Sequence, residues 1–323
     1  MRKVHGGMAA LQLAAIGFLA AAPSLYFLPN AAEAARPFAL MAAQTPPFEE
    51  GLYAHSRGDF AVARTWFLQA AASGVPEAQF YLGWMYAKGE GGAADPVEAL
   101  RWYRAAADQG YAAAQSDLGT LHAAGLGVRQ DYREAVRWYR MAADQGEAVA
   151  QFNLAIAYDK GEGVRQDQAE AARWYRRAAD QGHAEAQNNL GSLYRLGEGV
   201  ERSDAEAAAW FARAAAQGVA LAQYSLGWMH SRGEGVAQDY GTAMRWFALA
   251  AEQGHAQAQY FLGIAYLAGV GVERDSFRAY LWLSLAEAGG DPDATALREE
   301  LEEHMRPAQI QAVDLTVRKW RGK

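Results

Sequence analysis

The sequence predicts an all-α solenoid built from helix–turn–helix repeats of 36 residues, and three spacings carry this prediction. Seven tryptophans follow one another at intervals of 36 residues, without a single insertion or deletion. A glycine follows each of them by eight residues, and a glutamine follows six of them by thirteen. A period of this length is typical of solenoids, in which each repeat is one supersecondary unit. The seven tryptophans are Trp66, Trp102, Trp138, Trp174, Trp210, Trp246 and Trp282.

Each repeat reads as two helices. In the repeat that begins at Asp131, apolar residues fall at i, i+3, i+4 and i+7 from Ala135 to Ala142, which is one face of a helix. Asp131 is a natural N-cap for this helix, and Gly146 is a natural glycine just beyond its end. A second helix is expected over residues 148–160. Because one such pair cannot bury its own tryptophan, we expect neighbouring repeats to stack.

The pattern A-Q-x-x-L-G-x-x-Y-x-x-G-x-G-V-x-x-D, followed by A-x-x-W-Y-x-x-A-A-x-x-G, resembles the Sel1-like repeats, relatives of the tetratricopeptide repeats. The resemblance covers about residues 50–290 and implies a right-handed α/α superhelix of six full repeats with capping units at both ends. It further implies a protein-interaction adaptor, in many cases in a bacterial envelope. One repeat matches at Gln187, Leu190, Gly191, Tyr194, Gly197, Gly199, Val200, Ala207, Trp210, Ala214, Ala215 and Gly218.

A few positions depart from this pattern. Ala155 replaces the glycine that follows the leucine, and His122 and His230 replace the tyrosine. Ser203-Asp204 is expected to shift the helix cap in its repeat. These departures are mild, so the fold prediction is unchanged.

The N-terminus has the composition of an export signal. Basic residues precede an apolar run over 8–28, and Ala32-Glu33-Ala34 fits the small-x-small pattern of a cleavage site. We expect residues 1–34 to be a signal peptide cleaved before Ala35, which would place the protein in the periplasm. The alternative is an uncleaved inner-membrane anchor facing the periplasm, since the apolar run is long enough to span a bilayer.

The predicted domains follow from these features. Residues 35–47 form a linker that ends in a Pro-Pro pair, and residues 48–290 form the solenoid with an N-terminal cap helix. Residues 291–323 form a C-terminal helical cap. In that cap, Pro307 is expected near the first position of the last helix, and Trp320 is expected to close the stack.

Composition excludes several classes of function. The chain carries a net charge of −7, which argues against a nucleic-acid binder. It contains no cysteine, which excludes disulfides, thiolate metal sites and a cysteine nucleophile. No serine is followed three residues later by lysine, and neither Lys-Thr-Gly nor His-Glu-x-x-His occurs. The histidines are spread over different repeats, and His122 and His230 are interpreted as satisfied structural residues. We therefore expect no catalytic site, metal or cofactor.

Two sets of arginines recur with the repeat. Arg101, Arg137 and Arg173 each follow a glutamate by three residues, and Arg104, Arg140 and Arg176 each precede an aspartate by four. These spacings predict ion pairs within single helices on a wet outer face, each worth a few tenths of a kcal/mol, rather than an anion-binding stripe.

The candidate binding residues are those that vary on the helix carrying the leucine–glycine pair. By resemblance to tetratricopeptide repeats, this helix lines the concave side, where tryptophan and tyrosine would anchor a protein partner. Trp84 and Trp228 stand out because they share one repeat position outside the 36-residue frame, although packing on neighbouring helices is an equal explanation. For Phe80 and its equivalents, packing is the favoured explanation. The predicted set is Trp84, Trp228, Phe80, Phe152, Ile156, Asn188, Arg195, Tyr224, Tyr260 and Ile264, with Asp159 at the rim.

The sequence thus predicts a non-catalytic scaffold or regulator in the bacterial envelope that binds a protein of neutral or basic surface. The alternative is an envelope enzyme or a protein that binds a peptidoglycan or β-lactam ligand.

Overall fold

The computed structural model describes residues 46–321, and all regular structure in that range is helical. Sixteen α-helices and no strands occur in these described residues. The described residues from Pro47 onward belong to one compact unit. The all-α solenoid predicted from the spacing of the tryptophans is therefore confirmed. The predicted signal peptide at 1–34 and most of the predicted linker at 35–47 lie outside the described residues.

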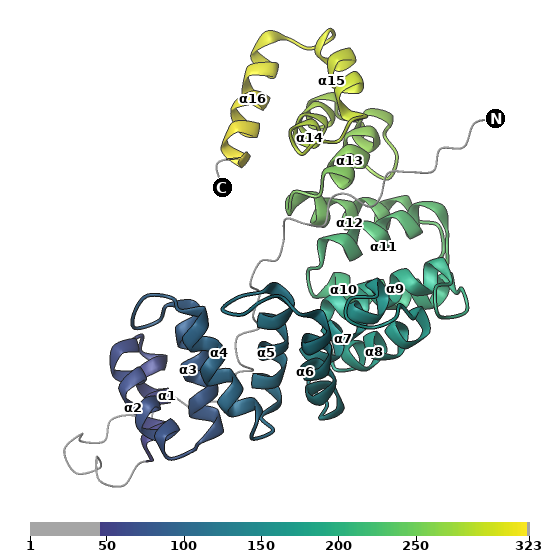
Figure 1. The fold of residues 1–323 in the computed structure, drawn as a ribbon. Helices are drawn as coiled ribbons and strands as arrows, with labels where there is room; N and C mark the ends of the chain where they lie inside the picture. The colour runs from purple at the N-terminus through teal and green to yellow at the C-terminus, as the bar shows by residue number, and fades with distance from the viewer. Residues whose placement is uncertain (1–45, 322–323) are drawn as a thin grey trace, which may run out of the picture. The chain divides into compact units, whose positions relative to one another are not determined.

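Two kinds of helix alternate along the chain (Figure 1). The tryptophan helices carry the tryptophans of the 36-residue frame, and the leucine helices between them carry the leucine–glycine pair, or Leu154-Ala155 in one case. The tryptophan helices are α2 (Phe60–Ala72), α4 (Pro96–Ala107), α6 (Tyr132–Asp144), α8 (Gln168–Asp180), α10 (Asp204–Ala216), α12 (Tyr240–Glu252) and α14 (Ser276–Ala288). The leucine helices are α3 (Pro76–Lys88), α5 (Ala112–Ala124), α7 (Ala148–Lys160), α9 (Ala184–Leu196), α11 (Ala220–Arg232) and α13 (Ala256–Ala268).

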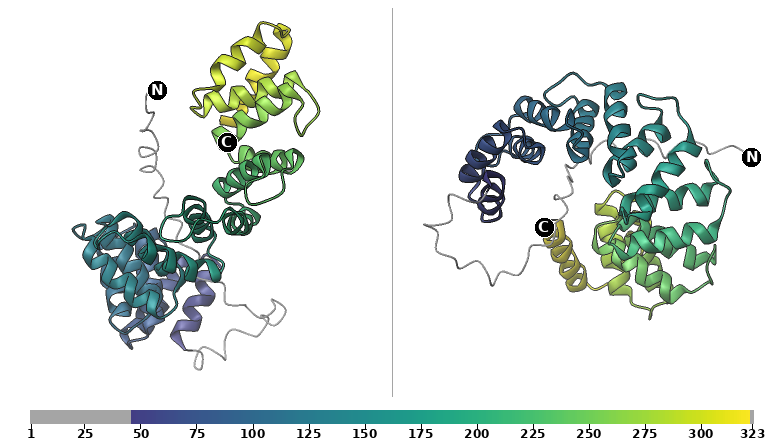
Figure 2. Two further views of the ribbon diagram at one scale, coloured as in Figure 1. Left: turned by 90° about the vertical axis from the view of Figure 1, so that its right-hand side faces the viewer. Right: turned by 90° about the horizontal axis from the view of Figure 1, so that it is seen from below.

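Three further helices lie at the ends of the series. Helix α1 (Pro47–Ser56) precedes α2, while α15 (Ala294–Glu302) and α16 (Pro307–Arg321) follow α14. Successive helices pack on one another from α1 to α15, and α16 packs on α14, as the ribbon shows (Figures 1 and 2). The last helix begins at Pro307, where the sequence predicts it.

Core clusters extend from one pair of helices to the next because the tryptophans of α6, α8 and α10 pack on the preceding leucine helix. Trp138 of α6 is 7% exposed and belongs to the cluster that contains Leu118 of α5 and Tyr103 of α4. Trp210 of α10 lies likewise with Leu190 of α9. Each unit therefore completes the core of its neighbour, which is the stacking that the repeat predicts.

Leucine and tryptophan helices approach closely at the glycine of the leucine–glycine pair. A Cβ atom built on Gly119 would lie 2.7 Å from ring atoms of Tyr139, which is itself 7% exposed. A side chain at this position would therefore force the two helices apart. The same pairing recurs at Gly83 with Tyr103 and at Gly191 with Phe211, so this glycine is a packing residue.

A row of buried glutamines joins the units by hydrogen bonds. Gln151 is 4% exposed, donates from Nε2 to the carbonyl oxygen of Ala143 at 3.2 Å, and accepts from Nε2 of Gln181 at 2.8 Å. Side-chain bonds of this second kind recur at four other junctions, and they join Gln109 to Gln79, Gln145 to Gln115, Gln217 to Gln187, and Gln253 to Gln223.

The glutamine row ends at Gln259. Gly289 stands where the next glutamine would fall, and the buried Oε1 of Gln259 has no hydrogen-bond partner within residues 46–321. The amide still donates to the carbonyl oxygen of Ala251 at 3.0 Å. The C-terminal edge of the row therefore holds one fewer hydrogen bond than its interior.

The helix ends follow the sequence with one exception. The Asp131 carboxylate accepts from the backbone N–H groups of Arg133 and Glu134, as an N-cap does. The expected shift at Ser203-Asp204 is wrong, because Ser203 itself is the N-cap of α10 and its hydroxyl accepts from the N–H of Glu206. Serine replaces aspartate here in the same register, since its hydroxyl reaches the same backbone donors.

The two arginine sets differ in the structure. Arg137 pairs with Glu134 at 3.1 Å within α6, and the same i,i+3 pairs occur at Arg101 and Arg173, as predicted. The intrahelical pairing predicted for the other set is wrong. Arg140 of α6 instead donates to the hydroxyl of Tyr158 in the next helix, α7, at 2.6 Å. Arg104 lies over the ring of Trp138, and Arg176 reaches Tyr194 and Trp210.

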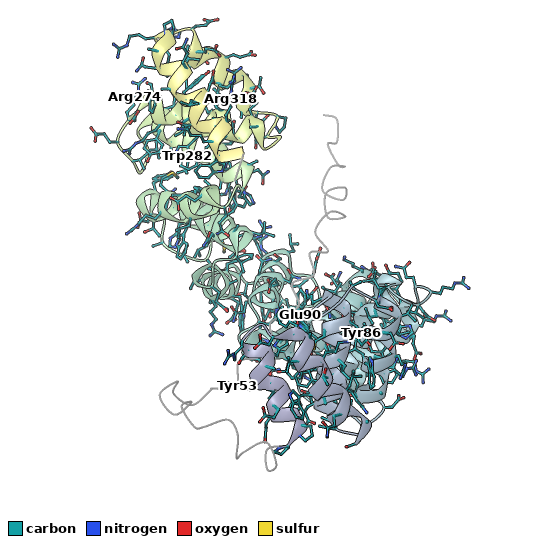
Figure 3. The ribbon with its side chains drawn as sticks, turned by 90° about the vertical axis from the view of Figure 1, so that its left-hand side faces the viewer. Tyr53, Tyr86, Glu90, Arg274, Trp282 and Arg318 are labelled. Atoms are coloured by element: carbon teal, nitrogen blue, oxygen red, sulfur yellow. The ribbon has the colours of Figure 1, made fainter. Side chains whose placement is uncertain are left out.

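Contacts at both ends close the series of helices. Near the start, His55 Nε2 lies 2.8 Å from Glu90 Oε2 and ties α1 to the loop after α3. Near the end, the rings of Trp282 in α14 and Trp320 in α16 meet edge to face with centroids 6.1 Å apart. Figure 3 labels Glu90 and Trp282 at these two places. The contact expected of Trp320 is therefore present.

Candidate functional site

The candidate site is the set of side chains that the leucine helices present two residues before and two residues after each leucine, together with Arg195 at its rim. We call it the leucine-helix surface. Of the predicted residues, Phe80 and Asn188 are buried, at 5% exposure each. Eight are half-buried and retain accessible area: Trp84, Phe152, Ile156, Arg195, Tyr224, Trp228, Tyr260 and Ile264.

Two aromatic residues that stand two before the leucine pack on the N-cap residue of the next leucine helix. Phe152 stacks on His183, with ring centroids 4.4 Å apart, and Tyr224 stacks on His255 at 4.5 Å. His183 and His255 also cap α9 and α13 by accepting backbone N–H groups at Nδ1. Phe152 and Tyr224 therefore pack within the fold, as the favoured explanation of this position predicts.

The two tryptophans outside the repeat frame have different surroundings. Trp228 of α11 meets Phe261 of α13 edge to face at 5.4 Å and packs partly against the core of the neighbouring units. Trp84 of α3 is absent from the core clusters of the described residues, and its ring is approached by the Lys88 ammonium at 5.0 Å. Trp84 is thus held less firmly than Trp228 by the rest of the fold.

The middle of the leucine-helix surface is polar. Asn188 donates to Asn189 Oδ1 at 3.1 Å, while its own Oδ1 has no hydrogen-bond partner in the described part of the chain. The Nε of Arg195 is buried and likewise lacks a partner there. Burial raises the pKa of Tyr224, and the nearby positive charge of Arg195 opposes that rise. Nearby on α8, Tyr175 donates to Asp159 Oδ2 of α7 at 3.3 Å.

Two acidic residues that the sequence prediction omitted interact with each other where α5 meets the start of α7. Burial, helped by the charge of Glu147, raises the pKa of Asp117 to about 7, although the Tyr103 hydroxyl and the charge of Lys88 lower it. Burial also raises the pKa of Glu147, whose carboxylate accepts the backbone N–H groups of Val149 and Ala150 at the start of α7.

The signal for this pair was present in the sequence but belongs to no periodic pattern. Asp117 directly precedes the leucine of α5, where the other leucine helices carry Tyr81, Asn153, Asn189, Ser225 and Phe261. Its neighbour Glu147 lies thirty residues further on, which is also the offset between hydrogen-bonded glutamines.

Comparison with known families identifies the repeat. The family model described as Sel1 repeat matches seven consecutive segments of the chain. The chain belongs to the Sel1 repeat family. The matched segments are residues 48–75, 76–111, 112–147, 148–183, 184–219, 220–255 and 256–291. Six are full repeats, as predicted, and the predicted N-terminal cap is part of a seventh, shorter Sel1 repeat.

A solved structure agrees with this assignment. A Sel1 repeat protein from Oxalobacter formigenes is 31% identical, over 75% of this chain and 97% of that chain, with a TM-score of 0.68. A protective antigen present in uropathogenic Escherichia coli strains, displaying an SLR fold, is 28% identical over 86% of this chain and 84% of that chain, with a TM-score of 0.37. A search of curated proteins gave no match. Sel1 repeat proteins are generally protein-interaction scaffolds, and their fold is typically non-catalytic.

Two Sel1 repeats carry histidine where the others carry tyrosine. His122 is 7% exposed, and neither of its ring nitrogens has a hydrogen-bond partner in the described residues. The Nδ1 of His230 also lacks a partner there. The prediction that both histidines have all their hydrogen-bond partners is therefore wrong. Tyr158 occupies the same position in another repeat and bonds an arginine there, whereas these imidazole nitrogens do not. Burial lowers the pKa of His122, which favours the neutral ring.

Residues 46–321 hold no cluster of three or more histidine, cysteine, aspartate or glutamate side chains arranged to bind a metal ion. No helix in the same range is long and apolar enough to cross a membrane. The apolar run at 8–28 lies outside that range.

Proposed function

We propose that this Sel1 repeat protein is a non-catalytic scaffold or regulator of the bacterial cell envelope that binds a protein partner through its leucine-helix surface. The proposal combines the general role of the family with the side chains that distinguish these repeats from one another. Residues shared by all repeats build the fold, since three frame tryptophans are buried, the other four are half-buried, and the buried glutamines bond one another. Residues that vary on the leucine helices are the ones left to recognise a partner.

The observation that carries this proposal is the pair Trp84 and Trp228. Both lie outside the 36-residue frame, both occupy the same repeat position four units apart, and both keep accessible area. Tryptophan is the residue type most enriched at interface hot spots, where a partly exposed ring fills a pocket of the partner. A stacked array that needs no folding on binding lowers the cost of ordering that surface.

The location follows from the N-terminal sequence. We propose that residues 1–34 direct export to the periplasm and are removed before Ala35, and that the alternative of an anchored protein keeps them. The intact mass of the protein recovered from the cell envelope tests this directly. A mass beginning at Ala35 supports removal, and the full-chain mass supports the anchor.

The partner-binding surface is tested by site-specific photo-crosslinking in the cells that make the protein. A photoreactive residue is placed at Trp84 or Trp228, and a control probe is placed at Arg137, whose side chain is 78% exposed on a tryptophan helix. We expect both tryptophan positions to capture one and the same protein and Arg137 to capture none of it. Crosslinks confined to this chain, or equal capture at Arg137, contradict the proposed surface.

A further inference from the structure

Arg195 of α9 is a half-buried cation for which the described part of the chain supplies no acceptor. It forms no ion pair, hydrogen bond or ring contact with another residue in 46–321. The other half-buried arginines of that range each lie against a carboxylate, a hydroxyl or an aromatic ring, and they are Arg64, Arg176 and Arg298. A guanidinium that gives up part of its hydration costs free energy unless an acceptor replaces the water. An acceptor from another molecule would offset that cost at Arg195.

The guanidinium of Arg195 is accessible to such a molecule. Its Nε is buried without a hydrogen-bond partner, but Nη1 and Nη2 do not belong to the buried polar atoms of the described residues. These two nitrogens carry most of the N–H donors of the group, and their geometry matches the two oxygens of a carboxylate. A carboxylate is therefore the acceptor that suits this group best.

Arg195 lies at the junction of α9 with the next leucine helix. One unit earlier, Asp159 occupies the same repeat position and accepts from Tyr175 of α8 at 3.3 Å. In α10, the place of that tyrosine is taken by Phe211, which has no hydroxyl. Helix α10 packs on both α9 and α11, so the two leucine helices are neighbours. Burial raises the pKa of Tyr224 in α11 and the positive charge of Arg195 opposes that rise, as expected of groups that lie near each other.

The facing part of α11 offers a further donor and an aromatic ring. Tyr224 and Trp228 share one face of this helix because they are four residues apart. The Tyr224 ring stacks on His255 at 4.5 Å, while its hydroxyl forms no hydrogen bond in the described residues. Trp228 meets Phe261 edge to face and still keeps accessible area. A cation, a hydroxyl donor and an aromatic ring thus border the same junction.

We propose that Arg195 binds a side-chain carboxylate of the protein partner, and that an apolar residue beside that aspartate or glutamate packs on Trp228. The guanidinium supplies charge and paired donors, and the Tyr224 hydroxyl supplies a further donor. The net charge of −7 on this chain disfavours a strongly acidic partner, so the partner segment carries a single carboxylate at this place. This inference rests on the proposed function and specifies the chemistry by which the partner is recognised.

The repeat itself supplies a variant that is safe for the fold. The other leucine helices carry side chains of different size and charge at this position, namely Ala87, Ala123, Asp159, Ser231 and Leu267. Arg195→Gln therefore introduces a neutral residue at a place that tolerates variation. The matched control is Arg165→Gln, because Arg165 is exposed in the loop after α7 and also lacks an ion pair or hydrogen bond in the described residues.

The test begins with selection from a library of random peptides displayed as N-terminal fusions, which leave no free C-terminal carboxylate. The immobilised bait is the chain as recovered from the cells that make it. We expect the enriched peptides to carry aspartate or glutamate at one fixed position next to an apolar residue. They should bind Arg195→Gln about tenfold more weakly or worse, and Arg165→Gln as tightly as the unaltered chain.

A double-mutant cycle then assigns the contact to Arg195. The fixed acid of the tightest selected peptide is replaced by its amide, and both peptides are measured on the unaltered chain and on Arg195→Gln. If the carboxylate binds Arg195, this replacement weakens binding to the unaltered chain but not to Arg195→Gln. Equal losses on the two chains place the carboxylate elsewhere and overturn the proposal.

Thermal stability gives a readout that needs no ligand. Arg195→Met keeps an unbranched side chain and removes the unpaired charge, so this variant should melt at or above the temperature of the unaltered chain. A lower melting temperature would mean that Arg195 already has an acceptor in the free protein, which contradicts the basis of the proposal.

The outcomes separate this inference from the proposed function. Enriched peptides without a fixed acid overturn the carboxylate site and leave the scaffold function standing. If no peptide is enriched but the probes at Trp84 and Trp228 capture a partner, recovery of that partner by Arg195→Gln decides, and undiminished recovery overturns the carboxylate site. If neither peptides nor a partner are captured, the leucine-helix surface is not a protein-binding surface, and both proposals fail.

Discussion

The tryptophan helices and the leucine helices differ in how closely their residues repeat from one unit to the next. Along the tryptophan helices, the same residue types return every 36 positions and disappear into the core, as Trp138, Trp174 and Trp210 do. Along the leucine helices, the leucine and the glutamine return in the same way, but the residues beside them change from unit to unit. Repetition therefore builds the fold, and we propose that the departures from repetition mark where it meets a partner.

The largest effect is expected in the repeated part. Trp174→Ala removes a side chain that is 6% exposed and leaves a cavity between two units, at a cost of about 3–5 kcal/mol. Chemical denaturation followed by circular dichroism measures this cost. Because units stabilise their neighbours, the loss should appear as an earlier or broader transition of the whole array. A change below about 1 kcal/mol would mean that Trp174 is not part of the shared core.

The glutamine row should contribute the next largest effect. Gln151→Leu removes two hydrogen bonds, one to the carbonyl oxygen of Ala143 and one from the Gln181 amide, which together should cost about 1–3 kcal/mol. The matched control is Gln259→Leu, since the Oε1 of Gln259 receives no donor in the described structure. Thermal melting of both variants tests the row. Equal losses for the two would contradict the hydrogen bonds assigned between glutamines.

Removing the charge of Asp117 should stabilise the fold, in contrast to the two substitutions above. The pKa of Asp117 is raised to about 7 in the folded chain, so the folded state binds its proton more tightly than the unfolded state. The contribution of Asp117 to stability is therefore complete below about pH 4 and is lost as the pH rises through about 7. Asp117→Asn should stabilise the fold by roughly 1–3 kcal/mol at pH 8 and hardly at all at pH 4.

Unfolding of both chains at several pH values measures this difference. The expected result is a gap between the Asp117→Asn chain and the unaltered chain that widens as the pH rises. A constant gap, or a destabilised Asp117→Asn chain at high pH, would mean that Asp117 is satisfied by its neighbours in the free protein.

The smallest effect is expected on the outer face. Arg137→Ala removes an exposed i,i+3 pair and should change stability by less than about 0.5 kcal/mol. Arg140→Ala should cost more, about 0.5–1.5 kcal/mol, because Arg140 bonds a hydroxyl of the next helix. Melting temperatures of the two variants compare them under one set of conditions. The reverse order would mean that the bond to Tyr158 adds nothing to the stacking of units.

Much of the fold was predictable because it repeats. The helix expected at 148–160 is α7, and the cap expected at Asp131 is present. What the sequence missed depends on contacts between units. Arg140 was assigned to an aspartate in its own helix, whereas the fold places a tyrosine of the next helix closer. The Asp117–Glu147 pair was not predicted because its two members lie thirty residues apart and neither belongs to a periodic pattern.

The candidate surface was predicted in outline but not in detail. Trp84 and Trp228 share a repeat position, yet only Trp228 has an aromatic neighbour, Phe261, because α3 and α11 are followed by different sequences. Asn188 belongs to the same predicted set and is buried. Periodicity places such residues on one side of a helix, and the side chains of the adjoining units decide how much of each remains accessible.

The measurement that tests this account most directly is recovery of the crosslinked partner by Trp84→Ala and Trp228→Ala chains, relative to Arg137→Ala. Circular dichroism melting of all three first verifies folding, with an expected cost below about 1 kcal/mol for Trp84→Ala and about 1–2 kcal/mol for Trp228→Ala. The account predicts that both tryptophan variants remain folded and lose the partner, while Arg137→Ala retains it. Full recovery of the partner by the folded tryptophan variants would contradict it.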